Sequence, residues 1–363
     1  MVKYIYSLIF CFGFYWMSAQ IPKSDRLEVV ADFGENMAIG VSVNSENRVF
    51  VSFPGHDGDG HLALAEVKDG QLISYPNREW NLKGDYDTHF LRIQDLYVDK
   101  EDMLWVLDSQ PGSSGNIFGD GKGDSAGLFK LVKINTRTDQ VERVYLFDDL
   151  DKSRSALNDV RVDPEKNHAY FSDPGLAAIV VMDLRDGSTR VLLEKSEYTL
   201  ADDITPVYDG KKMINENGDS FSSHINGIAL THDMKYFYFK PINKDELFRI
   251  ETRYLVDTSL DDEDLRSKVE VFPGVGITHG LIADRRGNVY LTTSESFSVS
   301  YITPDGEIHT LVKDPRLIWP DSLGIGTDGY LYFSCAQIQR LPQWNGGRDE
   351  TDYPYQMYRI ALP

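Results

Sequence analysis

Six residues at corresponding positions of a repeated sequence pattern are the strongest candidates for chemistry in this chain. They are Ile39, Gln94, Asn158, Asn226, His279 and Asp321. Each comes just before a short apolar run that is typical of a strand, yet five of the six are polar. His279 has the side chain type that exchanges protons near neutral pH. With Asp321 as a neighbour, it could act as acid or base in a tautomerisation.

The six positions belong to six copies of one strand–turn–strand pattern. The clearest copy is Thr278–Ser294, THGLIADRRGNVYLTTS, in which two apolar runs flank a turn containing Gly and Asn. The other copies begin near Met37, Leu91, Leu157, Ile225 and Trp319. We take as equivalent Gly40, Asp95, Asp159, Gly227, Gly280 and Ser322. The intervals between them leave room for a four-stranded sheet and its loops in each copy.

Radial repetition of such sheets predicts an all-β, six-bladed propeller. Gly227–Leu230 and Gly280–Ala283 are apolar on both alternations, which is typical of strands covered on both faces. A β-sandwich is the alternative, but sandwich strands do not repeat one motif six times. Leu27–Phe33 and Tyr355–Leu362 resemble strands without hairpin partners, so we expect them to close one blade.

In a propeller, equivalent positions lie at equal depth around one axis, so the six residues should form a ring at the mouth of the central channel. We call this set the axial ring. The predicted ligand-binding residues are Gln94, Asn158, Asn226, His279, Asp321 and Trp319, with His279 and Asp321 as the catalytic pair. The expected neighbours are Asp159, Tyr86, Arg92 and His224. The alternative is that these polar groups only cap strand ends and hold water, since Asn and Asp favour turns. His and Gln have no such preference.

Other kinds of chemistry find less support in the sequence. It contains no Ser-His-Asp order, phosphate-binding glycine loop or histidine pair with metal-ligand spacing. Cys335 falls in a predicted second strand, so we interpret it as a small buried hydrophobe rather than a nucleophile. We predict no cofactor, and a divalent cation in the channel is the weaker alternative.

Charge and the N-terminal segment indicate an exported protein. The 363 residues include 37 basic and 57 acidic ones, a formal charge of −20, which argues against nucleic acids and anionic membranes as partners. Residues 1–19 have a positive start, an apolar run and a small-residue exit at Ala19, as a secretory signal peptide does. We therefore expect a secreted, monomeric propeller of residues 20–363, extracellular or periplasmic, without membrane insertion and with a small-molecule ligand.

Several segments resemble the Yellow and major royal jelly protein family. They are VFVSFPG (Val49–Gly55), LWVLDSQ (Leu104–Gln110), NDVRVD (Asn158–Asp163), NGIALTHDMKYFYFKP (Asn226–Pro241) and WPDSLGIGTDGYLYFSCAQIQRLPQWNGG (Trp319–Gly347). The resemblance implies a six-bladed propeller and export. Some members are associated with dopachrome conversion, and others bind small amines or are nutritional. It therefore implies either an isomerase related to L-dopachrome tautomerase or a non-catalytic amine-binding protein.

A more distant resemblance is to regucalcin and gluconolactonase propellers, whose metal site uses Glu, Asn and Asp at the starts of inner strands. Asn158 and Asn226 fall at matching positions. His279 stands where the Asp is expected, and Ile39 stands where the Glu is expected. Loss of that Glu removes a strong anionic ligand, so a metal-dependent lactonase is the third alternative.

Overall fold

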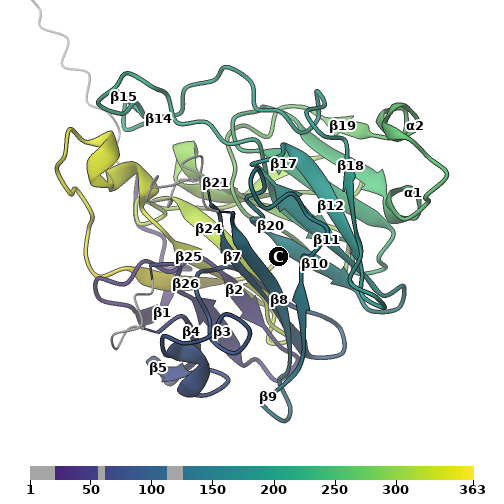
Figure 1. Ribbon diagram of the computed structural model, residues 1–363. Coiled ribbons are helices and arrows are strands. Elements are labelled where there is room, and N and C mark those ends of the chain that lie inside the picture. The colour runs from purple at the N-terminus through teal and green to yellow at the C-terminus, as the bar shows by residue number, and fades with distance from the viewer. Residues whose placement is uncertain (1–20, 56–61, 113–125) are drawn as a thin grey trace, which may run out of the picture.

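The computed structural model describes residues 21–55, 62–112 and 126–363, and within them six four-stranded antiparallel sheets form the blades of a propeller (Figure 1). The predicted fold is confirmed. The predicted signal peptide, residues 1–19, lies outside the described part of the chain. No helix within the described ranges is long and apolar enough to cross a membrane.

Each blade has an inner strand at the axis, two middle strands and an outer strand. The inner strands are β2 (Val41–Val43), β6 (Ile93–Val98), β10 (Val160–Asp163), β16 (Ile225–Leu230), β20 (Leu281–Ala283) and β24 (Pro320–Ile325). The second strands are β3 (Val49–Ser52), β7 (Met103–Gln110), β11 (His168–Asp173), β17 (Tyr236–Pro241), β21 (Val289–Thr293) and β25 (Tyr330–Cys335). The third strands are β4 (Leu64–Lys68), β8 (Leu128–Asn135), β12 (Ala178–Asp183), β18 (Leu247–Glu251), β22 (Ser298–Ile302) and β26 (Gln356–Ala361). The outer strands are β5 (Gln71–Ser74), β9 (Gln140–Leu146), β13 (Thr189–Leu192), β19 (Glu270–Phe272), β23 (Ile308–Lys313) and β1 (Glu28–Asp32).

A few short elements lie outside the blades. They are the two-stranded sheet of β14 (Val207–Tyr208) and β15 (Lys211–Lys212), the helices α1 (Thr252–Leu255) and α2 (Asp262–Arg266), and 3₁₀ turns at Glu79–Asn81, Ser294–Ser296, Ile338–Arg340 and Pro342–Trp344. An Asp261 capping box begins α2.

The N-terminal strand closes the propeller by joining the blade that the C-terminal strands build. β1 pairs antiparallel with β26, and Figure 1 shows the two side by side. Glu28 lies opposite Arg359 in this register, and their side chains form an ion pair of 2.7 Å. The predicted closure by Leu27–Phe33 and Tyr355–Leu362 is confirmed, and it covers the edge that β26 would otherwise expose.

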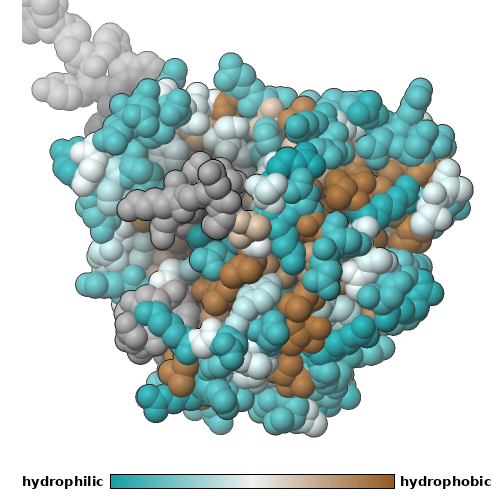
Figure 2. Space-filling view, in the orientation of Figure 1, coloured by the Kyte–Doolittle hydropathy of each residue, from teal (hydrophilic) through white to brown (hydrophobic). Residues whose placement is uncertain are grey.

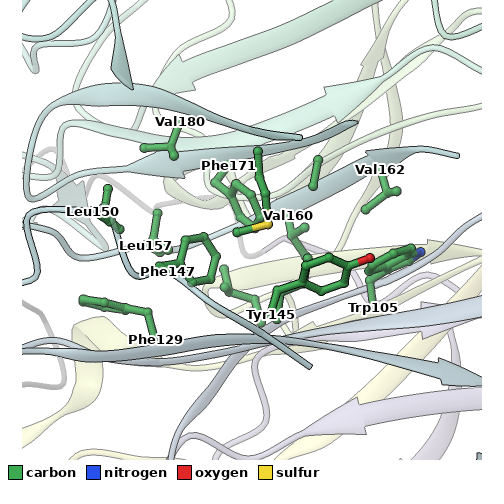
Figure 3. Close-up of a cluster of buried hydrophobic side chains, with 14 of the residues drawn as sticks. Trp105, Phe129, Tyr145, Phe147, Leu150, Leu157, Val160, Val162, Phe171 and Val180 are labelled. Atoms are coloured by element: carbon green, nitrogen blue, oxygen red, sulfur yellow. The ribbon is translucent and has the colours of Figure 1, made fainter. Parts of the chain in front are cut away.

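The core lies between neighbouring blades. Figure 3 shows one such interface, where Phe129 and Tyr145 of the second blade meet Val160 and Phe171 of the third. Such packing buries both faces of each blade, which explains the continuous apolar runs in the sequence. On the outside, apolar groups reach the surface as narrow strips among hydrophilic ones (Figure 2).

A β-bulge recurs at the start of the inner strands. The registers of β6 with β7, β16 with β17 and β24 with β25 shift at Gln94, Asn226 and Asp321–Ser322 respectively. In the first and third blades, Ser52 and Ser172 each exchange backbone hydrogen bonds with two consecutive residues. A bulge frees a backbone N–H and re-aims a side chain. Gln94, Asn226 and Asp321 therefore lie within their inner strands, whereas Ile39, Asn158 and His279 come just before theirs, as the sequence predicts.

In the first, third and fifth blades, hydroxyl groups of the second strands accept backbone N–H groups at the start of the inner strands. Ser52 Oγ accepts from the Gly40 N–H at 2.9 Å, Ser172 Oγ from Asp159 at 3.1 Å, and Thr292 Oγ1 from Gly280 at 2.8 Å. An unpaired buried N–H would cost about 1–3 kcal/mol, so these hydroxyls stabilise the starts of the inner strands.

Glycine at the second bulge position permits the inner strands to approach one another closely. A Cβ atom on Gly227 would lie 2.0 Å from the His279 carbonyl oxygen, and one on Gly280 would lie 2.1 Å from that of Asp321. These contacts are with backbone, which cannot rotate away. The spacing between consecutive inner strands is therefore set by glycine.

We expect Gly280→Ala to destabilise the protein by more than about 2 kcal/mol, because the new methyl group must push two inner strands apart. Gly55→Ala is the matched control, since nothing lies within 4 Å of a Cβ at that position. Urea denaturation of both variants provides the measurement. Equal stabilities of the two variants would contradict this explanation of Gly280.

Candidate functional site

The axial ring lies at the end of the channel where the inner strands begin, which we call the strand-start mouth. Gln94, Asn226 and Asp321 lie where the ladders of their blades are bulged. Bulges are over-represented beside active sites because they turn a side chain out of the regular alternation. The fold therefore builds polar positions into strands that are otherwise apolar.

His279, Trp319 and Asp321 form one cluster across the fifth and sixth blades. The His279 imidazole stacks on the Trp319 indole, with ring centroids 3.8 Å apart. The Trp319 Nε1–H donates to Asp321 Oδ2 at 3.1 Å. Trp319 has a φ of +53°, a left-handed conformation that is costly for a bulky residue. Strain of this kind persists where the surroundings impose it, and it is frequent at functional sites.

The other side of His279 is held by two hydroxyl groups. His279 Nε2 lies 2.7 Å from Ser294 Oγ, which in turn lies 2.9 Å from the Tyr208 hydroxyl. The His279 side chain is buried, and its Nδ1 atom has no hydrogen-bond partner among the described residues. Burial, with a smaller contribution from the Lys240 charge, lowers the pKa of His279 to about 3. The imidazole is therefore neutral at physiological pH.

The excursion between the third and fourth blades forms an apolar cap over this cluster. Tyr208, Met213 and Phe221 pack in one buried group with Ile39 and Trp319. The Phe221 ring meets the Trp319 indole edge-on, at 5.2 Å between centroids. The long polar excursion of the sequence, Asp202–Ser223, thus contributes apolar residues that hold Trp319 and His279 in place.

Three carboxylates and one arginine lie together at the axis below the cluster. Arg161 Nη1 donates to Asp95 Oδ2 at 2.7 Å, and Asp95 also accepts the Val160 N–H at 3.0 Å. Asp159 accepts from the Asn158 amide at 2.8 Å. Arg161 neutralises one of the three negative charges and leaves Asp159 and Asp321 without a matched cation.

Burial and the neighbouring charges together shift the pKa of both carboxyl groups. Burial raises the pKa of Asp321 to about 7, with the Asp95 charge adding to the effect and the Trp319 hydrogen bond opposing it. Burial and then the Asp95 charge raise the pKa of Asp159 well above its ordinary value, although Arg161 opposes them. Burial by itself would lower the pKa of Arg161, but the Asp95 and Asp159 charges outweigh it and raise that pKa, so the guanidinium stays charged.

The other predicted site residues take more separate places. Neither the Gln94 nor the Asn226 side chain hydrogen-bonds to another described residue. Lys130 Nζ lies over the Tyr86 ring at 4.4 Å and pairs with Asp108, whose carboxylate accepts the Arg92 N–H. This group belongs to the start of the second blade. His224 Nδ1 accepts the Ala201 N–H at 3.0 Å, and burial lowers the pKa of His224. The predicted set therefore divides into a connected cluster and several outlying groups.

Several buried polar atoms at the strand-start mouth have no partner among the described residues. They are Gln94 Oε1, Thr278 Oγ1 and His279 Nδ1. Leaving such an atom unpaired costs about 1–3 kcal/mol unless water or a ligand satisfies it. Orphaned acceptors and donors next to a strained aromatic pair are what a polar small molecule could bind.

The side chains at this mouth do not fit a metal site of the lactonase type. The Ile39 side chain lies in the apolar cap, and the Asn158 amide nitrogen donates to Asp159. In the part of the chain that the structure describes, no three His, Cys, Asp or Glu side chains are placed to hold one metal ion. Cys335 is buried and free, and burial raises the pKa of its thiol, so its surroundings disfavour the thiolate.

Sequence reasoning missed Asp95, Arg161, Ser294 and Tyr208 as members of the site. Asp95 is one of the six equivalent positions that define the repeat, and it directly follows Gln94 of the axial ring. Arg161 is a charged residue within a strand expected to be buried on both faces, a signal that calls for a buried partner. Ser294 and Tyr208 lie far from the repeated positions, so only the folded chain brings them to His279.

Comparisons with known proteins agree with this architecture. Residues 93–362 match the family model described as Major royal jelly protein. No curated protein matches the sequence. A gluconolactonase from Xanthomonas campestris shares 12% identity, with 93% of this chain and 89% of that chain covered and a TM-score of 0.56.

Two other solved structures show the same fold. Regucalcin from Agrobacterium tumefaciens, described as a calcium-binding protein, shares 13% identity, covers 92% of each chain and has a TM-score of 0.54. A virginiamycin B lyase from Staphylococcus aureus shares 13% identity over 93% of this chain and all of that one, with a TM-score of 0.50. At these identities, the likeness concerns the fold alone.

We expect Asp321→Asn to change how stability depends on pH. Folded Asp321 keeps its proton up to about pH 7, whereas an unfolded aspartate releases it near pH 4. Between these values the folded state binds more protons, so this group lowers stability as pH rises, by up to about 1.4 kcal/mol per pH unit. Above pH 7 the loss of folding stability caused by Asp321 is complete and no longer changes with pH. Asparagine does not titrate, so it lacks this loss.

Urea denaturation at pH 5, 6, 7 and 8 measures the effect. The stability of Asp321→Asn relative to the wild type should increase up to about pH 7 and then level off. Asp69→Asn, in the exposed turn between β4 and β5, is the control and should show a constant difference. A constant difference for Asp321→Asn as well would contradict the raised pKa.

Proposed function

The chain belongs to the major royal jelly protein family, and from that premise we propose that it is an isomerase acting on a small cyclic, quinone-like metabolite. The proposed substrate site is the strand-start mouth, and the proposed reaction is a tautomerisation related to dopachrome conversion. The observation that carries the proposal is the position of the Asp321 carboxyl, which accepts from the Trp319 indole that stacks on His279. The raised pKa of Asp321, about 7, suits proton exchange at neutral pH.

In this proposal Asp321 transfers the proton. Its carboxylate removes a proton from a C–H bond of the substrate while the electron pair moves into the conjugated ring system. The protonated Asp321 then returns a proton at a different carbon or oxygen atom. Substrate and product have the same atoms and electrons, so the step needs no oxidant or cofactor.

His279 and Trp319 hold and orient the substrate. Because the imidazole is neutral, with Nε2 held by Ser294, the free Nδ1 atom is placed to form a hydrogen bond to a substrate oxygen or nitrogen. From sequence alone, His279 was the expected proton carrier. The lowered pKa of His279 and the raised pKa of Asp321 support the reverse assignment.

Binding of a small amine without turnover is the second candidate. It is favoured by the excess of carboxylates over Arg161 at the axis, since Asp159 and Asp321 could pair with an ammonium group. The overall charge of −20 would also attract a cationic ligand. Both candidates use the same mouth, and formation of product distinguishes them.

Steady-state kinetics with L-dopachrome and related aminochromes tests the proposal. We expect kcat of the wild type to rise with pH through about 7, as Asp321 loses its proton. Asp321→Asn should lower kcat by about 100-fold or more. His279→Gln should weaken activity less and leave the pH dependence in place, while Asp69→Asn should have no effect.

Two results would contradict the assignment. Ligand binding without product from any cyclic substrate would favour the amine-binding protein. Loss of the pH dependence in His279→Gln, with Asp321→Asn fully active, would return the proton-transfer role to His279.

A further inference from the structure

A cavity lies at the end of the channel opposite the strand-start mouth, where the inner strands end. Its volume is about 410 Å³, which is within the range of small-molecule sites. All six blades contribute to its wall, through residues such as Ser42, Leu96, Arg161, Leu230, Ile282 and Leu323. We call this cavity the far mouth. None of the axial ring residues lines it.

Arg161 forms part of the wall of the far mouth and extends across the channel. Its side chain is 6% exposed. Nη1 donates to Asp95, and Nη2 donates to the Leu281 carbonyl of the fifth blade at 3.0 Å. Its Nε atom has no hydrogen-bond partner among the described residues. A residue that lines the cavity therefore carries a buried, charged donor group with an unused hydrogen.

Tyr97 supplies a second unused donor in the same wall. The Arg161 guanidinium lies over the Tyr97 ring at 5.5 Å. The Tyr97 hydroxyl makes no hydrogen bond to the described residues, and burial raises the pKa of Tyr97, so the hydroxyl stays protonated. Arg285, exposed and without a hydrogen bond or ion pair to the described residues, adds a positive charge to the wall.

The carboxylates in the same wall are already engaged by their own surroundings. Asp99 accepts from the Trp105 indole at 2.8 Å and from two backbone N–H groups. Asp102 accepts from Ser45 and Arg137. Asp284 accepts from two side chains and two backbone N–H groups. The groups in this cavity wall that still lack a hydrogen-bond partner are therefore mainly donors.

We propose that the far mouth is a second binding site, specific for a small carboxylate with an apolar body. The carboxylate would accept from Arg161 Nε and the Tyr97 hydroxyl, while Arg285 attracts the anion at the entrance. The apolar body would contact Leu96, Leu230 and Leu323. A charge-assisted pair of donors favours a carboxylate over a neutral amide of the same shape.

Isothermal titration of the protein with benzoate, benzamide and benzylamine tests the site. Benzoate should bind at least about tenfold more tightly than benzamide, and benzylamine should not bind here. Tyr97→Phe keeps the ring over Arg161 but removes the hydroxyl, so it should weaken benzoate about five- to tenfold. Arg285→Gln should weaken benzoate and reduce the salt dependence of binding.

Asp321→Asn serves as the control for the strand-start mouth and should leave benzoate affinity unchanged. The proposal is overturned if benzoate binds no better than benzamide, or if Tyr97→Phe and Arg285→Gln both retain wild-type affinity. It is also overturned if Asp321→Asn is the variant that loses benzoate, since the anion would then bind at the strand-start mouth. Because benzoate binding needs no turnover, this test is independent of the proposed isomerase activity.

Discussion

The buried pair between Arg161 and Asp95 is the interaction on which both ends of the channel depend. The guanidinium bonds to the second and fifth blades as well as to its own strand. Removing one partner of such a pair leaves an uncompensated buried charge, which typically costs about 3–5 kcal/mol. Burial, together with the nearby Asp95 charge, raises the pKa of Asp159 and of Asp321, so both carboxyls hold their protons more tightly than usual. The fold thereby holds the Asp321 carboxyl group near its own pKa at neutral pH.

Backbone geometry converts this charge arrangement into a site. Bulges place polar side chains at the starts of β6, β16 and β24, and second-strand hydroxyls in the other three blades accept N–H groups at the same level. Glycine at positions such as 280 lets each inner strand approach its neighbour. The apolar cap packs on Trp319, which in turn stacks on His279. Each of these features is local, but together they fix the positions of side chains on consecutive blades relative to one another.

Much of the fold could be predicted because repetition is visible in the sequence. Six hairpin patterns with Gly, Asn and Asp turns indicated six blades, and the two unpaired strands at the ends indicated the closure. The bulges could not be seen, because inner strands such as β16 are buried on both faces and show no alternation that an extra residue would interrupt. The recurring Ser or Thr of the second strands, as in Ser52, Ser172 and Thr292, marks the same level in the other three blades. The pKa values of His279 and Asp321 depend on burial and on neighbours such as Lys240 and Asp95, which no spacing in the sequence encodes.

The most direct test of this account is the titration of Asp321 itself. Protein labelled with ¹³C at aspartate side-chain carboxyls would be followed by NMR from pH 4 to 9. Asp321→Asn would identify the resonance by its disappearance. The account predicts a midpoint near pH 7 for Asp321. A midpoint near 4, the ordinary value for an exposed aspartate, would contradict it.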